Sequence, residues 1–390
     1  MEKEQPFDET YPMKDGYKRF DAQNTAFSLK QRRTGGKAFS YMNEKGEKMK
    51  SDMPGFSLLD YAFKEAAETY TGHGTDTGYY SWSPLGVTSK PDDIPRWEES
   101  PEKASKVVKK AAKFYGAVNA GFCMMDKRWI YSNTSDGKPI VFEDVEQGYI
   151  TDEKVVIPNS HKYVIALTVP MEFIENSYAP TNIEVTSNMG YSRMHVLAGT
   201  VAEFIRGLGW NAIPCGNDIS LSVPTAIQAG LGHLGRMGRL ITWEKGPLVR
   251  ICKVYTDLPL APSPPAPKGI IEFCDVCMKC AKYCPSQSIP YGPRTWESEH
   301  DSVSNNNGTY KWYTNEESCF DYCHEVGTGC SICFRCCDFT HERGISHEIV
   351  KWFIRNVPQL NRFFVWTDEL LGYGKISDAK TYWDEPYKPS

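Results

Sequence analysis

Ten of the 13 cysteines in the chain lie between positions 274 and 337, and four of them have a spacing suited to iron–sulfur chemistry. Cys274, Cys277, Cys280 and Cys284, with Pro285 directly after, form the run C-x2-C-x2-C-x3-C-P. In this bacterial ferredoxin pattern three thiolates hold one four-iron cluster, and the fourth thiolate binds a second cluster. The sequence therefore predicts two [4Fe–4S] clusters, and two clusters in series imply an electron acceptor beyond them.

A second group of cysteines supplies the remaining ligands. Cys330, Cys333 and Cys337 form C-x2-C-x3-C, and reciprocity with the first run predicts that Cys337 returns to the first cluster. The last ligand of the second cluster is either Cys319 or Cys323, and the spacing alone leaves this choice open. The two predicted sets are Cys274, Cys277, Cys280 and Cys337 for the first cluster, and Cys284, Cys330, Cys333 and one of that pair for the second.

A zinc ribbon is the alternative interpretation of these cysteines. Two of the C-x2-C pairs would provide the four thiolates that close a zinc site. That assignment would leave Cys280, Cys284 and Cys337 at cluster spacing by chance, so clusters are the preferred prediction. Cys336 receives no role, and three further cysteines are interpreted as small buried hydrophobic residues: Cys123, Cys215 and Cys252.

Gly230, Gly232 and Gly235 match the dinucleotide-binding pattern G-x-G-x-x-G, but the context of that pattern is missing. The motif follows a strand and opens a helix, with an acidic residue about 20 positions further on. Here residues 224–229 are predicted to be helical, residues 240–243 to be extended, and position 255 is Tyr. The glycines are instead interpreted as positions where the backbone passes close to another large flat ligand.

The region before the cysteines predicts the elements that position them, as a mixed α/β core at 100–258. Ser100, Pro101 and Glu102 form a typical helix start, and apolar residues continue at helical spacing to about position 115. Residues 117–124, 164–169 and 248–255 are apolar runs typical of buried strands, and residues 194–209 form a second amphipathic helix. Helices that alternate with strands favour an α/β architecture.

Composition sets the boundaries and excludes some classes of partner. Five prolines between 259 and 267 disfavour regular structure and mark a linker. The predicted units are an N-terminal unit at 1–99, the core at 100–258, the proline-rich linker at 259–268, a two-cluster domain at 269–345 and an aromatic tail at 346–390. The net charge of −5 argues against nucleic acid as a partner. No stretch approaches the roughly 18 apolar residues of a membrane span, and no apolar region follows the Arg32–Arg33 pair as an export signal would require.

The stretch 190–292 resembles the respiratory reductive dehalogenases, which are corrinoid and iron–sulfur enzymes. The resemblance rests on the phrases FIRGLG, NAIP, LSVP and TDLPL beside the double cysteine set, and it continues more weakly into the tail. It implies an α/β (α+β) fold with a nitroreductase-like cobalamin-binding core and a bacterial ferredoxin-like two-cluster domain. It also implies base-off cobalamin as a cofactor, which makes Gly230, Gly232 and Gly235 candidates for corrinoid contacts.

The resemblance also implies a catalytic trio of Tyr191, Asn217 and Arg250. Tyr191 would donate a proton, Arg250 would stabilise the phenolate that forms, and Asn217 would orient the phenol or the halogen. By the same comparison Cys319 takes the open ligand position of the second cluster. Cys323 then stands where relatives often have a tryptophan, and it is predicted to line the substrate pocket.

The expected function is that of a terminal reductase in organohalide respiration that replaces halogen by hydrogen on a small chlorinated aliphatic compound. The expected partners are the organohalide, a small membrane-anchor protein and an upstream electron donor, and a homodimer remains compatible with the sequence. The expected location is the outer face of the cytoplasmic membrane, with this sequence as a mature chain without its signal. The alternatives are an epoxyqueuosine reductase acting on transfer RNA and a non-catalytic iron–sulfur electron-transfer protein.

Overall fold

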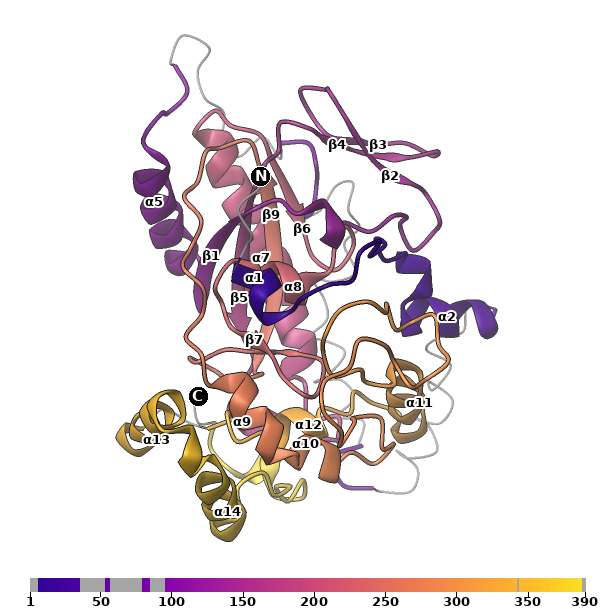
Figure 1. Cartoon of the computed structure of the whole chain (residues 1–390), viewed down its shortest axis with the longest axis vertical. Coiled ribbons are helices and arrows are strands. Elements are labelled where there is room, and N and C mark those ends of the chain that lie inside the picture. The colour runs from indigo at the N-terminus through magenta and orange to yellow at the C-terminus, as the bar shows by residue number, and fades with distance from the viewer. Residues whose placement is uncertain (1–5, 36–52, 57–78, 85–94, 342–343, 388–390) are drawn as a thin grey trace.

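A computed structural model of the chain describes residues 6–35, 53–56, 79–84, 95–341 and 344–387. Its centre is a four-stranded sheet in which every neighbouring pair is antiparallel (Figure 1). The strand order is β1 (Asn119–Met124), β5 (Tyr163–Pro170), β9 (Val249–Thr256) and β6 (Ala212–Cys215). An antiparallel sheet with helices on its faces is the α+β form of the predicted mixed fold.

Successive side chains of the central strands point to opposite faces of the sheet, and both faces are buried. On β5, Ile165 and Leu167 join one apolar cluster, whereas Val164 and Ala166 join the other. The first cluster includes residues of α5 (Pro101–Phe114) and α7 (Thr186–Gly207), and the second includes residues of α8 (Ser222–Gln228). Burial on both faces explains why β5 and β9 read as continuous apolar runs rather than as alternating ones.

The remaining elements surround this core. Before and between its strands lie α1 (Pro6–Thr10), η1 (Ala22–Asn24), α2 (Ala26–Arg33), η2 (Lys127–Trp129), β2 (Ile140–Glu143), β3 (Tyr149–Ile150), β4 (Val155–Pro158), α6 (Phe173–Asn176), β7 (His233–Leu234) and β8 (Leu240–Ile241). The cysteine region holds α9 (Ile270–Cys277), α10 (Lys279–Lys282), α11 (Glu316–Val326) and α12 (Ile332–Arg335). The tail holds α13 (Ile345–Asn356), η3 (Pro358–Leu360), α14 (Asn361–Leu371) and η4 (Tyr382–Asp384).

The predicted core elements are present, with different ends. The helix predicted from residue 100 is α5, and the Ser100 side chain accepts a hydrogen bond from the Lys103 backbone N–H at 3.3 Å, as an N-cap does. The strands predicted at 117–124, 164–169 and 248–255 are β1, β5 and β9. The helix predicted at 194–209 begins earlier, at Thr186, and the tail forms two helices that were not predicted.

The proline-rich segment runs beside the core without helix or strand, as its composition predicts. Ser263 joins it to β1, because its backbone N–H donates to the Phe122 carbonyl at 2.8 Å and its Oγ accepts from the Phe122 N–H at 2.9 Å. Past this segment the cysteine region shares one apolar cluster with the sheet, to which Ile270 and Phe273 belong. The described N-terminal residues also join it through Phe7 and Tyr11.

Within the described ranges, no helix combines the length and apolar character needed to cross a membrane. In Figure 1 the sheet occupies the upper part of the molecule, and helices α9 to α14 lie below it. The cysteines and the predicted catalytic residues therefore meet where these two parts join.

Candidate functional site

The four cysteines predicted to bind the first cluster line one small cavity. Cys274, Cys277, Cys280 and Cys337 share it with Arg236, Asp338 and apolar side chains. The chain reaches this arrangement by a sharp turn at Met278, whose φ of 56° lies in the left-handed region between α9 and α10. Such a conformation is uncommon for a residue other than glycine, and here it separates the two cysteines of a C-x2-C pair.

The second predicted set lies in a different, much larger cavity of about 1010 Å³. Cys284, Cys319, Cys330 and Cys333 line it, and Cys323 lines it as well. Ser331, with a φ of 50°, turns the chain directly after Cys330, just as Met278 does directly after Cys277. The pairs Cys277–Cys280 and Cys330–Cys333 thus begin with the same kind of backbone turn.

Burial disfavours the free thiolate at several cysteines of both sets. Burial raises the pKa of Cys274 to about 11 and the pKa of Cys330 to about 12. Buried thiols with raised pKa values are poor nucleophiles, but metal binding deprotonates them. Nine cysteines line the two cavities, four in the small one and five in the large one, because Cys323 joins the second set there. A zinc ion closes with four ligands, so a zinc ribbon would use only part of this arrangement.

The other cysteines lie outside these two cavities. Cys123, Cys215 and Cys252 are buried in the apolar clusters of the core, as predicted. Cys336 is also buried and lines neither cavity, and its Sγ lies 3.7 Å from the Cys333 carbonyl oxygen as a hydrogen-bond donor. Burial raises the pKa of its thiol to about 12. Cys336 therefore packs between the two sets without facing either cavity.

The three residues of the predicted catalytic trio line the same large cavity as the second cysteine set. Tyr191 comes from α7, Arg250 from β9 and Asn217 from the loop after β6. The guanidinium carbon of Arg250 lies 4.8 Å from the centre of the Tyr191 ring. The Asn217 Oδ1 accepts a hydrogen bond from the Ser222 Oγ at 3.0 Å. A guanidinium therefore lies against a phenol ring in the cavity lining, to which a hydrogen-bonded amide also belongs.

Glu184 is a charged residue of this region that the sequence did not single out. Its side chain is almost completely buried, and its Oε1 accepts a hydrogen bond from the Ser187 Oγ at 3.1 Å. Burial raises the pKa of Glu184 to about 7, although the charge of Arg250 acts in the opposite direction. The residue lies in an irregular segment before α7, where no periodicity or motif marks a single glutamate.

An ion pair that includes Arg239 of the cavity lining lies close enough to Cys319 to affect its electrostatics. Arg239 donates two hydrogen bonds to Glu316, at 3.1 Å and 3.0 Å, in the bidentate geometry that suits a guanidinium. Its positive charge lowers the pKa of the Cys319 thiol, while burial raises that pKa to about 12 overall. A cation held next to thiolates offsets the negative charge that builds up when a cluster binds.

The structure gives the three glycines of the G-x-G-x-x-G segment a different explanation from the predicted corrinoid contact. A Cβ on Gly230 would lie 2.1 Å from the Pro264 carbonyl oxygen, and one on Gly232 would lie 2.2 Å from the Ile241 carbonyl oxygen. A Cβ on Gly235 would collide with the Ile241 side chain. None of the three lines the large cavity, so their placement supports close packing within the protein and not a cofactor contact.

The large cavity suits a bulky and mostly apolar cofactor. Its volume of about 1010 Å³ lies at the upper end of the roughly 300–1,000 Å³ that is usual for small-molecule sites. Aromatic and aliphatic side chains make up more than half of its lining, and polar groups such as Asn217, Arg239 and Arg250 are interspersed among them. The Arg250 Nε is buried without a hydrogen-bond partner, so this wall has an unused donor. These features fit a large flat cofactor between Tyr191 and the second cysteine set.

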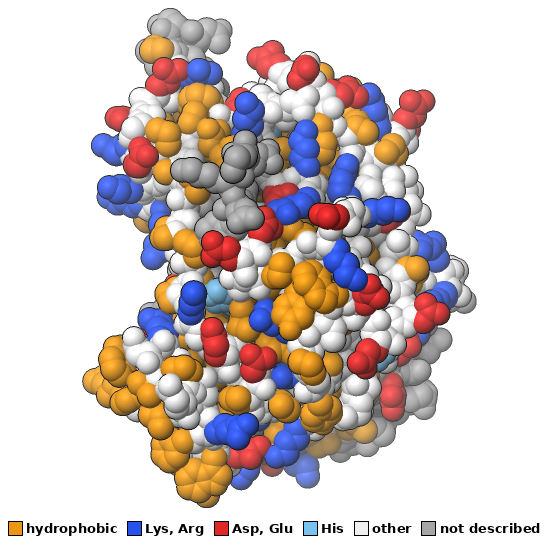
Figure 2. Space-filling model, viewed as in Figure 1, with side chains coloured by type: hydrophobic (Ala, Val, Ile, Leu, Met, Phe, Trp, Pro, Cys, Tyr) orange, Lys and Arg blue, Asp and Glu red, His pale blue; other side chains and the backbone are white. Residues whose placement is uncertain are grey.

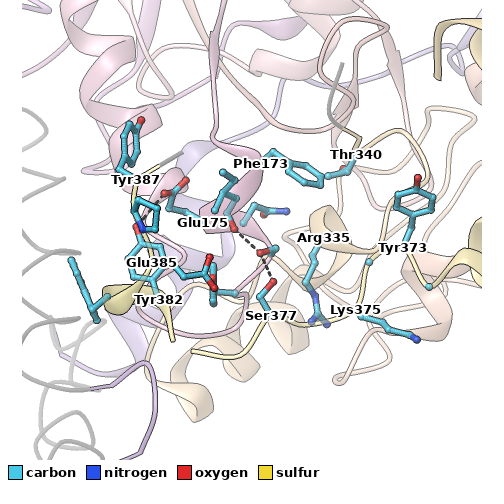
Figure 3. Close-up of a pocket in the computed structure, with 18 residues that line it drawn as sticks. Phe173, Glu175, Arg335, Thr340, Tyr373, Lys375, Ser377, Tyr382, Glu385 and Tyr387 are labelled. Atoms are coloured by element: carbon cyan, nitrogen blue, oxygen red, sulfur yellow. Dashed lines mark hydrogen bonds between the residues drawn. The ribbon is translucent and has the colours of Figure 1, made fainter. Parts of the chain in front are cut away.

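A further cavity, of about 590 Å³, lies between α6 and the C-terminal segment (Figure 3). Arg335 and Lys375 lie at one end, and Glu175, Tyr382 and Glu385 lie at the other. Ser177 and Ser377 hydrogen-bond across it at 2.7 Å. None of the predicted site residues lines this cavity, so the candidate functional site is the larger one.

Comparison with known proteins gives a consistent result. A family model described as reductive dehalogenase subunit matches residues 129–260. The tetrachloroethene reductive dehalogenase of Sulfurospirillum multivorans is 35% identical over 326 residues, which cover 80% of this chain and 64% of that protein. The tetrachloroethene reductive dehalogenase of Desulfitobacterium hafniense is 33% identical over 350 residues, covering 79% and 63% respectively. The chain thus spans a little under two thirds of the length of these relatives.

The fold is similar to that of a solved structure, the catabolic reductive dehalogenase NpRdhA in complex with 3-bromo-4-hydroxybenzoic acid. The TM-score is 0.68 at 19% sequence identity, and the match covers 94% of this chain and 48% of that chain. An epoxyqueuosine reductase of Gloeobacter violaceus is 27% identical over only 121 residues, 29% of this chain. The similarity to dehalogenases therefore extends over much more of the sequence.

Proposed function

Because this chain belongs to the reductive dehalogenase family, we propose that it replaces halogen by hydrogen on a small chlorinated aliphatic compound. The observation that carries this proposal is one cavity in which Tyr191, Asn217 and Arg250 face four cysteines at cluster spacing. The names of the relatives point to chlorinated ethenes as the substrate class. The reaction consumes two electrons and one proton and releases a halide ion.

The proposed cofactors are a corrinoid and two [4Fe–4S] clusters. The corrinoid belongs in the large cavity, the first cluster with Cys274, Cys277, Cys280 and Cys337, and the second with Cys284, Cys319, Cys330 and Cys333. When bound, these groups supply a reduced metal centre and the electrons that reach it. The core is proposed to be nitroreductase-like and the cysteine region ferredoxin-like, and the repeated turns at Met278 and Ser331 support the second assignment.

The residues of the cavity wall supply the proton and the positive charge. Tyr191 donates the proton to the carbon that loses the halogen, and this leaves a phenolate. Arg250, 4.8 Å from the Tyr191 ring, stabilises that phenolate by its charge. Asn217, fixed by Ser222, orients the phenol or the departing halogen. The mostly apolar lining excludes water, which strengthens these electrostatic interactions.

Cys323 is proposed to help determine which substrate fits. It lines the cavity beside the second cysteine set but is not assigned as a ligand. A cysteine is small, so this side of the cavity has room for a substrate that a large aromatic residue would exclude. The proposed partners are a small membrane-anchor protein and an upstream electron donor, with the chain peripheral at the outer face of the cytoplasmic membrane.

Chloride release provides the test of the proposed function. The chain, reconstituted anaerobically with iron, sulfide and a corrinoid, would be incubated with a chemical reductant and a panel of chlorinated methanes, ethanes and ethenes. We expect stoichiometric chloride from at least one chlorinated ethene, and no release when the corrinoid is omitted. Reconstituted protein that binds both kinds of cofactor and releases no chloride from any compound would leave only an electron relay.

A further inference from the structure

The two C-terminal helices carry an unusually apolar surface. Seven large apolar side chains on or directly after them are more than half exposed, with Ile345 at 84% and Leu371 at 70%. We call this surface the α13–α14 patch; it consists of Ile345, Ile349, Trp352, Phe363, Trp366, Leu370 and Leu371. Figure 2 shows hydrophobic side chains gathered in the region where Figure 1 places these helices. Exposed apolar residues on soluble proteins are usually scattered, and a contiguous patch marks an interaction site.

The patch is the outer face of helices whose inner faces are already used. On α13, Val350 and Ile354 pack against the main apolar cluster of the protein, and on α14 Phe364 and Val365 do the same. The patch residues recur on the other side at 345, 349 and 352, and at 363, 366 and 370. These are the i, i+3, i+4 and i+7 spacings of a helix face. A helix that is apolar on two opposite faces needs a second apolar contact, and the described residues do not provide it.

The charges at the edge of the patch are predominantly positive. The two exposed acidic residues of α13 and α14 are paired, Glu348 with Lys351 at 2.8 Å and Glu369 with Lys282 at 2.7 Å. Arg355, Arg362 and Lys375 are exposed and form no ion pair with another described residue. The protein as a whole has a net charge of −5, so this positive edge is a local property that complements a negatively charged surface.

We propose that the α13–α14 patch inserts into the surface of a lipid bilayer that contains anionic lipids. Helices that bind in the plane of a membrane combine Trp, Phe and Leu on one face with flanking Lys and Arg. Aromatic side chains such as Trp352 and Trp366 are favoured at the boundary between headgroups and hydrocarbon. The patch lies on a helix pair at one end of the molecule, away from the sheet (Figure 1), where it can approach a flat surface.

The role of membrane binding in electron delivery rests on the proposed function, because the patch lies close to the first cysteine set. Asp368 of α14 forms a buried ion pair with Lys279, which stands between Cys277 and Cys280 in the chain. Lys279 also pairs with Asp338 at 2.7 Å, and the Cys277 Sγ lies 3.3 Å from an oxygen of Asp338. Insertion of α14 would therefore bring the predicted first cluster close to an electron donor held in the same membrane.

Vesicle binding of the full reconstituted chain is the test. The probes are sedimenting vesicles of phosphatidylcholine alone and of phosphatidylcholine with 30% phosphatidylglycerol, at low and high salt. We expect binding to the mixed vesicles, with quenching of tryptophan emission by lipids brominated near the headgroups. The double variant W366S/L370S should bind the mixed vesicles at least tenfold more weakly than the parent. The variant R362E should lose mainly that part of the binding affinity that high salt also removes. Phe114→Ser, which removes an 86% exposed phenylalanine on α5, is the matched control and should bind like the parent.

Other occupants of the patch would give different results. The parent chain could instead bind neither kind of vesicle and form a dimer. If light scattering then showed that W366S/L370S is a monomer, the patch would be the contact with a second copy, and the proposal would be overturned. Equal binding of the parent and W366S/L370S would overturn it as well. Chloride release with a soluble reductant is measured in parallel and should be the same in all these variants, so a failure of vesicle binding is distinct from a failure of the proposed dehalogenation.

Discussion

At the scale of single residues, the proposed chemistry depends on a tyrosine, an arginine and two sets of cysteines. The cysteine spacing predicted the first ligand set and three members of the second, because ligand geometry restricts where cysteines can lie along the chain, and the choice of Cys319 over Cys323 came from the resemblance. Tyr191 and Arg250 were identified only through the resemblance, since a single tyrosine or arginine in a sequence does not indicate a catalytic site. Glu184 was missed for the same reason, and its importance depends on burial beside Arg250, which only the folded chain provides.

Tyr191→Phe tests the proton donor. The substitution removes the hydroxyl and keeps the ring against Arg250, so we expect chloride release to fall by roughly 10²- to 10⁴-fold, the usual contribution of general acid catalysis. Iron and cobalt contents should stay at parent values, which shows that the cavity still holds its cofactors. Turnover at the parent rate in the phenylalanine variant would exclude Tyr191 from this role.

Cys337→Ser and Cys336→Ser form a matched pair of neighbouring substitutions. Cys337 lines the first cavity and Cys336 lines neither cavity. We expect Cys337→Ser to lower the iron content from about eight towards about four atoms per chain, because one four-iron cluster loses a ligand. Cys336→Ser should keep the parent content in the same assay. If Cys336→Ser lowered the iron content and Cys337→Ser did not, the fourth ligand of the first cluster would be Cys336 and not Cys337.

Glu184→Gln tests the buried carboxyl group through the pH dependence of stability. Because burial raises the pKa of Glu184 from 4.5 to about 7, the folded chain keeps a proton that the unfolded chain loses over this range. The free energy of unfolding of the parent should therefore fall as the pH rises from about 4.5 to about 7, by about 3 kcal/mol relative to the variant. Denaturant unfolding of both proteins at pH 5 and pH 8 measures this difference. Parallel pH profiles would show that Glu184 ionises normally in the folded chain.

At the scale of elements, the predictions succeeded where one apolar face or one apolar run marks the element. The helix α5 has a capping serine, a proline in its first turn and a single apolar stripe, and its start was predicted correctly. The helices α13 and α14 were read only as an aromatic tail, because apolar residues on two opposite faces hide the helical period. The antiparallel pairing of β5 with β9 could not be predicted from the sequence, since a fully buried strand has a continuous apolar run whether its neighbour is parallel or antiparallel.

Ser331→Val tests the repeated turn that positions the second cysteine set. A β-branched residue is strongly disfavoured at the positive φ of this position, whereas glycine adopts it freely. We expect Ser331→Val to lower the iron content from about eight to about four atoms per chain and Ser331→Gly to keep it. Full iron content in the valine variant would mean that the turn is not needed for cluster binding.

At the scale of the whole molecule, the proposed active centre is the large cavity where the sheet and the cysteine region meet. The sheet side supplies Tyr191 and Arg250, and the cysteine region supplies Cys284 and Cys330. These residues are far apart in sequence but line the same cavity. The described N-terminal residues close it further, since Tyr11 and Phe27 belong to its lining. The proline-rich segment has no helix or strand, as its composition predicts, and the two parts that it joins share one apolar cluster.

The placement of the cofactors can be measured by anomalous diffraction from crystals of the reconstituted chain, at the cobalt and iron absorption edges. We expect one cobalt peak inside the cavity that Tyr191, Arg250 and Cys330 line, and two separate iron sites, one among each set of four cysteines. A protein that takes up corrinoid and shows no cobalt peak in that cavity would exclude the proposed cofactor site. A single metal ion in place of either iron cluster would exclude the two-cluster arrangement.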